Sequence, residues 1–168
     1  MNLLDNIVIT DTNIITDLFT ASLLEKFIWL DSVFVVDLLA YDEFNEKTGN
    51  IEQISKIKLI NANSNDVVNA LNISAIQNKL SFYDSINFVL AKRLNAVLAT
   101  GDKRLGIFAI ENGVQVIRTL KIIELMYEYK LILLNEMVSG LIKLLNDSYT
   151  RIPRNEILKL INKYIKYP

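Results

Sequence analysis

The chain has 168 residues, of which 51% are hydrophobic and 22% are charged, and its net charge is −1. This length and composition suit one compact domain with a real hydrophobic core. The sequence contains no cysteine and no histidine, which excludes a disulfide framework, a thiolate site, and the commonest general base and zinc ligand. Any catalysis must therefore use carboxylates, hydroxyls, lysines or a metal bound through oxygen, and oxygen ligands suit Mg²⁺ or Mn²⁺.

The sequence predicts a cytoplasmic protein without a membrane segment. No apolar run approaches the roughly 20 residues needed to cross a bilayer, and Asp5 stands where a signal peptide would need positive charge. Charge is uneven along the chain: residues 1–118 carry 14 acids against 10 bases, and residues 119–168 carry 5 against 8. Because nucleic-acid binders are often more basic than this, charge alone argues mildly against such a role.

Strands and helices alternate along the first 118 residues. Apolar runs predict strands over residues 6–10, 33–36, 57–60, 96–99 and 114–117. Between them, helical spacing predicts helices over residues 13–20, 21–30, 38–47, 65–79, 81–94 and 103–112. This alternation predicts an α/β fold with a parallel sheet covered on both faces. The runs at 7–10 and 97–99 are expected to lie side by side at its centre.

Two of these helices are expected to turn an apolar face inward. In helix 65–79 the inward positions are Val67, Val68, Leu71 and Ile76. In helix 81–94 the positions spaced by three and four residues are Phe82, Ile86, Val89, Leu90 and Leu94.

The last fifty residues have a different pattern, with three helices over residues 119–129, 133–145 and 153–167 and no strand between them. We therefore expect an α/β domain over residues 1–118 and a helical extension over residues 119–168. Its apolar stripes pack either on the domain or on a partner, and periodicity favours neither. Its basic side chains either line an RNA path or simply solvate the helices, and solvation is the safer interpretation.

Four carboxylates occupy suggestive places: Asp11, Glu43, Asp84 and Asp102. Taken singly, each is best explained by helix capping: Asp11 and Asp102 precede helices, Ser81 and Asp84 have capping-box spacing, and Glu43 suits a helix N-terminus. Taken together, they indicate a site. Asp11 and Asp102 both follow buried strands, and in an open parallel sheet this edge carries the ligand crevice. The helices that carry Glu43 and Asp84 can bring them to the same region.

Several carboxylates held close together repel one another unless a cation lies between them, so the pattern implies a divalent metal. Such a metal can activate a water for phosphodiester cleavage without histidine or cysteine. The alternative is aspartyl-phosphate chemistry, but Asn13 stands where that signature has a second aspartate. No Gly-rich phosphate loop follows any predicted strand, which argues against nucleotide binding.

At these residues the chain resembles the PIN-domain family. The matching pieces span residues 7–117 and read IVITDTNII, the acid in LAYDEF, SFYDSINFVLAKRLNAVLATGDKRL, and GVQVI. The resemblance implies a three-layer α/β/α sandwich with a central parallel sheet, and Mg²⁺- or Mn²⁺-dependent endoribonuclease activity on single-stranded RNA. Many small prokaryotic members are VapC-type toxins, often homodimers, that a cognate antitoxin protein neutralises.

By position, the resemblance makes Asp11, Glu43, Asp84 and Asp102 the catalytic and metal-binding quartet, with Asn13 and Thr100 as supports. A shift of one residue would put Asp42 in place of Glu43.

The C-terminal helices are similar to an extension of some PIN-like proteins that begins with Gly-Thr-Leu, where this chain has Arg118, Thr119 and Leu120. Lys103 and Arg104, beside Asp102, are candidates for contacts to RNA phosphates. The prediction is a metal-dependent ribonuclease, and the alternative is a non-catalytic PIN-like module that binds or regulates.

Overall fold

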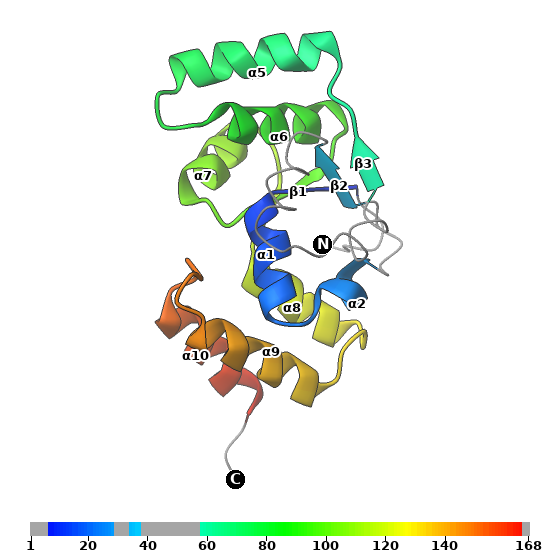
Figure 1. The fold of residues 1–168 in the computed structure, drawn as a ribbon, viewed down its shortest axis with the longest axis vertical. Helices are drawn as coiled ribbons and strands as arrows, with labels where there is room; N and C mark the ends of the chain where they lie inside the picture. The colour runs from blue at the N-terminus through cyan, green and yellow to red at the C-terminus, as the bar shows by residue number, and fades with distance from the viewer. Residues whose placement is uncertain (1–6, 29–33, 38–57, 166–168) are drawn as a thin grey trace.

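The computed structural model describes residues 7–28, 34–37 and 58–165 (Figure 1). Within these residues, the strands are β1 (Val8–Thr10), β2 (Phe34–Asp37), β3 (Lys58–Ile60), β4 (Val97–Ala99) and β5 (Val116–Ile117). They form a parallel sheet in the order β3-β2-β1-β4-β5. The expected neighbours at the centre of the sheet are confirmed, because β1 pairs with β4 in the register Val8 to Val97 and Thr10 to Ala99.

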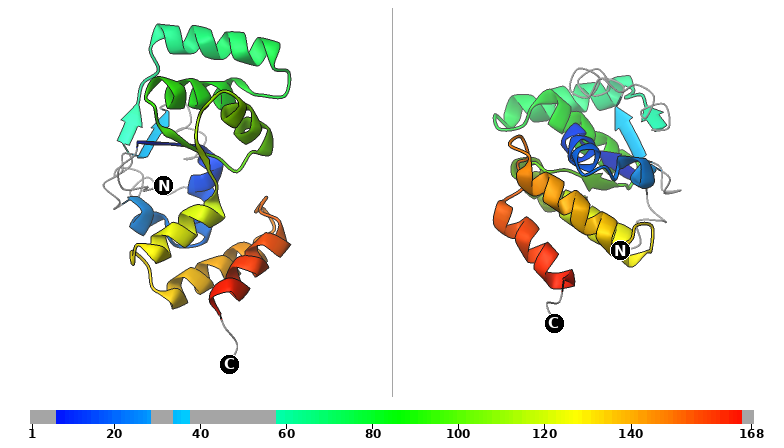
Figure 2. Two further views of the ribbon diagram at one scale, coloured as in Figure 1. Left: turned by 180° about the vertical axis from the view of Figure 1, so that it is seen from behind. Right: turned by 60° about the horizontal axis from the view of Figure 1, so that its bottom comes forward.

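Helices cover both faces of this sheet. The helices are α1 (Thr12–Thr20), α2 (Leu24–Ile28), α5 (Ser64–Ile76), α6 (Phe82–Arg93), α7 (Lys103–Glu111), α8 (Thr119–Glu128), α9 (Leu134–Asn146) and α10 (Arg154–Tyr164). Helices α5, α6 and α7 lie on one side, and α1, α2 and α8 lie on the other, with α9 and α10 outside them (Figures 1 and 2). The predicted three-layer α/β/α fold with a helical C-terminus is confirmed. None of the described helices is long and apolar enough to cross a membrane.

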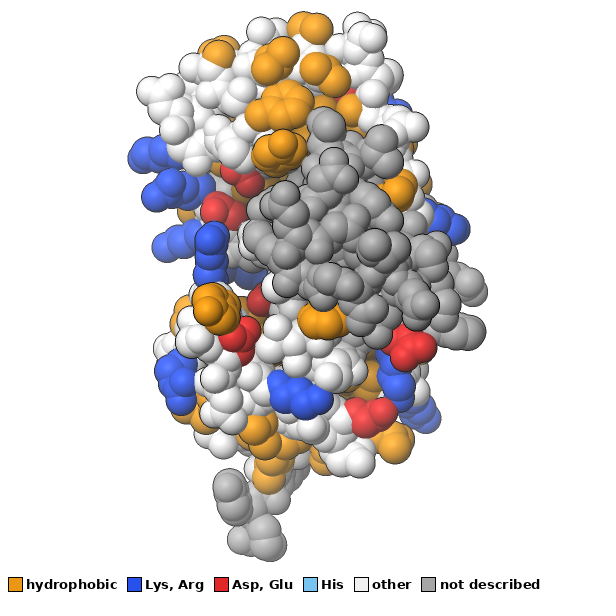
Figure 3. All heavy atoms as spheres, in the orientation of Figure 1, with side chains coloured by type: hydrophobic (Ala, Val, Ile, Leu, Met, Phe, Trp, Pro, Cys, Tyr) orange, Lys and Arg blue, Asp and Glu red, His pale blue; other side chains and the backbone are white. Residues whose placement is uncertain are grey.

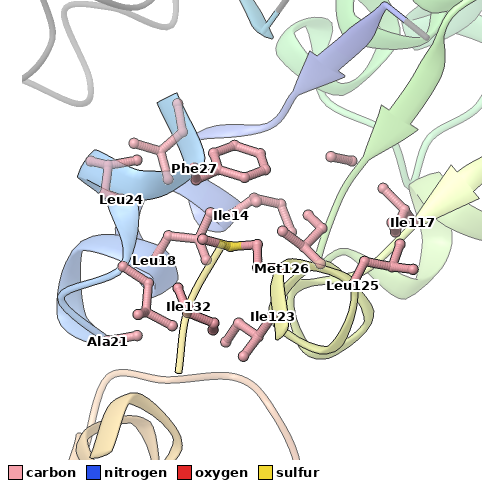
Figure 4. Close-up of a cluster of buried hydrophobic side chains, with 14 of the residues drawn as sticks. Ile14, Leu18, Ala21, Leu24, Phe27, Ile117, Ile123, Leu125, Met126 and Ile132 are labelled. Atoms are coloured by element: carbon pink, nitrogen blue, oxygen red, sulfur yellow. The ribbon is translucent and has the colours of Figure 1, made fainter. Parts of the chain in front are cut away.

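Alternation along β1 and β4 divides the hydrophobic core into two. Successive side chains of a strand point to opposite faces of the sheet. Val8 and Val97 therefore pack with α1 and α8, in the cluster of Figure 4, whereas Ile9 and Leu98 pack with α6 and α7. Both central strands are buried on both faces, which explains why their sequences are continuous apolar runs.

The inward face predicted for helix 65–79, which corresponds to α5, is wrong. In α5, Val68, Leu71 and Ile76 are exposed and Val67 is half-buried, whereas Ala70 is fully buried. The reason is that α5 packs on α6 and not on the sheet (Figure 1). Its small buried side chain, Ala70, lies in one cluster with the side chains of α6, and Ile73 packs against that cluster, whereas Val68, Leu71 and Ile76 point outward.

Helix α6 is more deeply buried than an amphipathic helix with one apolar face. All residues from 85 to 91 are buried, including the polar Ser85 and Asn87. The cause is that α5 and α7 cover the sides of α6 that do not face the sheet. Phe88 of α6 makes an edge-to-face contact with Phe108 of α7, with 4.8 Å between ring centroids. Phe82 and Leu94, which we expected to be core positions, are only half-buried.

The C-terminal helices share a core with α1 and α2. Met137, Leu141 and Ile157 are fully buried in the same cluster as Ile14 and the side chains of α8. Helix α10 begins at Arg154, with Pro153 as its N-cap, one residue later than expected. The domain boundary between residues 118 and 119 stays a prediction.

Candidate active site

The carboxyl ends of the two central strands bring the polar residues of the predicted site together. Asp11 follows β1 directly, and residues 100–102 follow β4. The Asp11 amide donates to the Ala99 carbonyl at 2.9 Å, so the pairing of the two strands continues to the acid itself. The parallel register therefore fixes Asp11 beside Thr100, as strand order predicts for this edge of the sheet.

Asp11 is a buried carboxylate with only 7% of its surface exposed. Its Oδ2 accepts hydrogen bonds from Thr100 Oγ1 at 2.9 Å and from Asn13 Nδ2 at 3.2 Å. Its Oδ1 has only long contacts, to Thr12 Oγ1 at 3.4 Å and to the Asn13 amide at 3.5 Å. Asn13 and Thr100 thus hold one oxygen firmly and leave the other weakly engaged.

Burial raises the pKa of the Asp11 carboxyl above its usual range. Hydrogen bonds from Thr100 and Asn13 oppose this rise, and the negative charge of Asp84 adds to it. Asp84 is therefore close enough to Asp11 for their charges to interact. A cation beside the pair would favour the ionised form of both carboxylates.

Asp84 also has a structural role, because it forms the capping box at the start of α6. Its Oδ2 accepts from the Ser81 amide and the Ser81 hydroxyl, both at 2.8 Å, and its own amide donates to Ser81 Oγ at 3.0 Å. No described residue donates a hydrogen bond to its Oδ1.

Asp102 is the N-cap of α7. Its Oδ1 accepts from the amides of Arg104 at 2.6 Å and Leu105 at 3.0 Å, and its own amide donates to Thr100 Oγ1 at 3.0 Å. No hydrogen bond reaches its Oδ2 from the described part of the chain. The capping roles considered from the sequence are thus present in all three acids, and each cap engages mainly one carboxylate oxygen.

The donor set suits a hard divalent cation, since it consists of carboxylate oxygens with neighbouring amide and hydroxyl groups. Among residues 7–28, 34–37 and 58–165, however, no group of three or more acids is placed to hold a metal ion. Glu43 and its alternative, Asp42, lie outside the described residues, as does the predicted helix 38–47. The fit to a metal therefore depends on the electrostatic interaction between Asp11 and Asp84. It also depends on the carboxylate oxygens with weak or no hydrogen bonds from described residues, which are Oδ1 of Asp11, Oδ1 of Asp84 and Oδ2 of Asp102.

The candidate phosphate contacts begin α7. Lys103 and Arg104 are both exposed, and neither forms an ion pair with a described residue. Arg93, at the far end of α6, instead pairs with Asp66, with 3.0 Å between Nε and Oδ1. The contact of Lys103 and Arg104 with RNA phosphates stays a prediction.

Sequence reasoning missed a further acid near the site, Asp17 on α1. Thr119 Oγ1 donates to its Oδ2 at 2.6 Å. Burial raises the pKa of Asp17 to about 6, against the hydrogen bond from Thr119 and with the help of the negative charges of Asp147 and Asp11. Its spacing of four residues from Asn13 was the available signal, since such positions share a helix face.

A family model for the PIN domain matches residues 7–166, from the start of the sheet through the C-terminal helices. The chain belongs to the PIN-domain family. PIN domains are generally nucleases and typically use divalent metals, so this PIN domain has a nuclease-type fold whose substrate class is nucleic acid. No curated protein matches the chain.

Proposed function

We propose that this PIN domain is a divalent-metal-dependent endoribonuclease that hydrolyses single-stranded RNA. The observation that carries the proposal is the buried Asp11 carboxylate, which lies within electrostatic range of Asp84 at the carboxyl edge of the sheet. Two acids whose charges repel inside a protein cost stability unless they serve a cation or a proton. The family gives the nuclease chemistry that such a cation serves.

The residues that would hold Mg²⁺ or Mn²⁺ are Asp11, Asp84, Asp102 and, from outside the described residues, Glu43 or Asp42. When bound, such a metal supplies an activated water and neutralises charge on the phosphate. Thr100 and Asn13 orient the Asp11 carboxylate, and the Thr100 hydroxyl also fixes the Asp102 amide. Lys103 and Arg104 bind phosphates of the RNA on the α7 side.

From the resemblance to VapC-type toxins, we further propose that the protein is a cytoplasmic prokaryotic toxin. It would act as a homodimer and be neutralised by an antitoxin protein. The exposed apolar side chains of α5, which include Val68, Leu71 and Ile76, favour a protein contact of this kind. Light scattering tests the dimer directly. A mass equal to one chain at high protein concentration would contradict self-association.

A second candidate is a non-catalytic PIN-like module that binds or regulates. The observation in its favour is that Asp11, Asp84 and Asp102 all cap helices, so each has a structural reason to be present. The two candidates differ in one measurable property, metal-dependent cleavage.

The test is to incubate the purified protein with a mixed single-stranded RNA and Mn²⁺ or Mg²⁺, with chelator and with Asp84→Asn. The asparagine Oδ1 can accept the Ser81 hydrogen bonds while the charge is lost. We expect cleavage by the wild type only with metal, and none by Asp84→Asn at nearly unchanged melting temperature.

The matched control is Glu136→Gln, because Glu136 has the same capping position in α9 and accepts from the Leu133 amide at 2.8 Å. It should cleave as the wild type does. Cleavage that persists in chelator, or is equal in Asp84→Asn, would reject the metal mechanism. RNA binding without cleavage under any metal would favour the binding module.

A further inference from the structure

A pocket of about 500 Å³ lies beside Asp102, between the α/β part of the chain and the C-terminal helices. Its walls come from α1, the turn between β4 and α7, the start of α8, and the loop between α9 and α10. Asn13 and Asp102 belong both to this pocket and to the carboxylate edge described above. The pocket is therefore continuous with the candidate active site.

Three cations line this pocket: Lys103, Arg118 and Arg151. All three are exposed, and within the described residues none has a side-chain hydrogen bond or an ion pair. Lys121 and Lys163 of the C-terminal helices are instead paired with Glu124. Figure 3 shows Lys and Arg side chains gathered over α7, next to acidic side chains. Cations left without protein partners beside a nuclease site suit phosphate groups.

The pocket also has acidic side chains, so its cations do not act alone. Asp17 is already engaged by the Thr119 hydroxyl, and Asp102 caps α7. Glu156 lies in the first turn of α10 and completes the lining. The wall is therefore of mixed charge: Asp17 and Asp102 come from the α/β part and Glu156 from α10, while the arginines come from the start of α8 and from the α9–α10 loop. A chain of alternating phosphates and bases fits such a wall better than a free anion does.

The α9–α10 loop presents an aromatic ring at the mouth of the pocket. Tyr149 is 90% exposed, although the loop that carries it is anchored. The Tyr149 amide donates to Asp147 Oδ1 at 3.0 Å, and Arg154 Nη1 donates to the Leu145 carbonyl at 2.6 Å. Figure 1 shows this loop rising from the C-terminal helices beside α1. Single-stranded bases stack on exposed aromatic side chains of this kind.

A second pocket, of about 840 Å³, lies against the same loop and shares Asn13, Tyr149 and Arg151 with the first. It also has Lys143 in its lining. The hollow surface therefore continues on both sides of Tyr149, as a path for a strand would.

We propose that the C-terminal helices supply a nucleotide subsite of the nuclease: a base of single-stranded RNA stacks on Tyr149, and Arg118 and Arg151 bind its flanking phosphates. This inference rests on the proposed function, since it names where the RNA lies next to the carboxylates. It gives the α9–α10 loop a role in substrate binding in addition to the packing of its flanking helices.

The test measures binding of a fluorescein-labelled single-stranded RNA of about ten nucleotides by fluorescence anisotropy in chelator, where no cleavage occurs. The variants are Tyr149→Ala, Arg151→Gln and Arg118→Gln. Lys130→Gln, in the turn between α8 and α9, is the control that removes one exposed positive charge elsewhere. We expect Tyr149→Ala and Arg151→Gln each to weaken binding about tenfold, with Lys130→Gln and all melting temperatures close to the wild type. Duplex RNA of the same sequence should bind more weakly, because its bases are not free to stack.

Failure of the subsite and failure of the nuclease proposal give different results. If the wild type cleaves RNA and the Tyr149 and Arg151 variants bind as tightly as it does, the subsite is wrong and the nuclease proposal stands. If RNA binds through these residues but no metal supports cleavage, the subsite stands and the nuclease proposal is wrong. If the wild type neither binds nor cleaves RNA, both are wrong. Asp84→Asn should keep RNA binding in chelator while losing cleavage with metal.

Discussion

The hydroxyl of Thr100 joins the two acids that follow the central strands. Its Oγ1 donates to Asp11 Oδ2 at 2.9 Å and accepts from the Asp102 amide at 3.0 Å. Asp11 and Thr100 are 89 positions apart in the sequence, and only the parallel pairing of β1 with β4 brings them together. One side chain therefore sets the position of a carboxylate and of the turn that carries the next one.

Thr100→Val should reduce cleavage about 10- to 100-fold, the usual effect of losing a group that orients a metal ligand. Valine has nearly the same shape but cannot donate to Asp11 or accept from Asp102. The metal concentration for half-maximal cleavage should rise, whereas Thr100→Ser should keep most activity because the hydroxyl remains. Equal metal dependence in the valine variant and the wild type would show that Thr100 does not position a ligand.

Asp17→Asn should stabilise the protein at pH 7. Because the folded pKa of Asp17 is about 6, against 3.8 ordinarily, the folded state binds its proton more tightly than the unfolded state does. The contribution of Asp17 to the free energy of unfolding is therefore fully present below about pH 4 and is lost as the pH rises through about 6. The total loss is at most about 3 kcal/mol. The asparagine variant should gain about 1–2 kcal/mol at pH 7 and lose this pH dependence.

Urea unfolding of both proteins between pH 4 and pH 7 checks the prediction for Asp17. The Thr119 hydrogen bond is not the source of the difference, since the asparagine oxygen can accept it as well. Parallel pH curves for the two proteins would contradict a raised pKa at this site.

Glu124 of α8 links this helix to α10, because it accepts hydrogen bonds from Lys163 and Tyr164. Burial by itself raises the pKa of Glu124, but hydrogen bonds from Lys121, Lys163 and Tyr164 lower it to about 2. A carboxylate with a lowered pKa stabilises the fold above its unfolded pKa of about 4.5, and this contribution is lost as the pH falls toward 2.

Glu124→Gln should therefore destabilise the protein by about 1–2 kcal/mol at pH 7, because the bonds to charged donors are lost. The difference from the wild type should shrink below pH 4. Glu128→Gln is the matched control, because Glu128 is an exposed carboxylate on the same helix with weaker contacts. It accepts a 3.2 Å hydrogen bond from the Tyr164 hydroxyl and lies 3.9 Å from Lys121 Nζ. In thermal melts, Glu124→Gln should have a clearly lower melting temperature than Glu128→Gln. Equal melting temperatures would show that Glu124 stabilises the fold no more than Glu128 does.

Gly140 allows α9 to approach the turn between α1 and α2. A Cβ at this position would lie 3.0 Å from the Ala21 carbonyl oxygen and 3.0 Å from Leu23 Cδ1. Gly140→Val should therefore cost about 1–3 kcal/mol through overpacking. Valine is a better helix former than glycine, so propensity alone would not destabilise this variant. Ser139→Val, at the exposed neighbouring position, is the control that places a valine in α9 without this close contact. A Gly140→Val melting temperature no lower than that of Ser139→Val would mean that α9 can shift without cost.

The sequence by itself determined the local structure of the site. The apolar runs at β1 and β4 predict buried strands because no polar side chain interrupts them. The S-x-x-D spacing of Ser81 and Asp84 predicts the capping box, since it depends only on the geometry of one helical turn. Parallel pairing at the sheet centre followed from the alternation of strands with helices, and it placed Asp11 next to Thr100.

Only the tertiary structure decided what covers each helix. The periodicity of α5 is real, but a hydrophobic stripe does not say which side of the helix another helix will cover, so Leu71 points outward and Ala70 inward. Asp17 acquires its raised pKa because the tertiary structure buries it, and a hydrogen bond from Thr119, which is distant in sequence, only partly opposes this rise. The place of Tyr149 beside the carboxylates likewise depends on how α9 and α10 dock on α1, through contacts between residues more than a hundred positions apart that local sequence patterns do not encode.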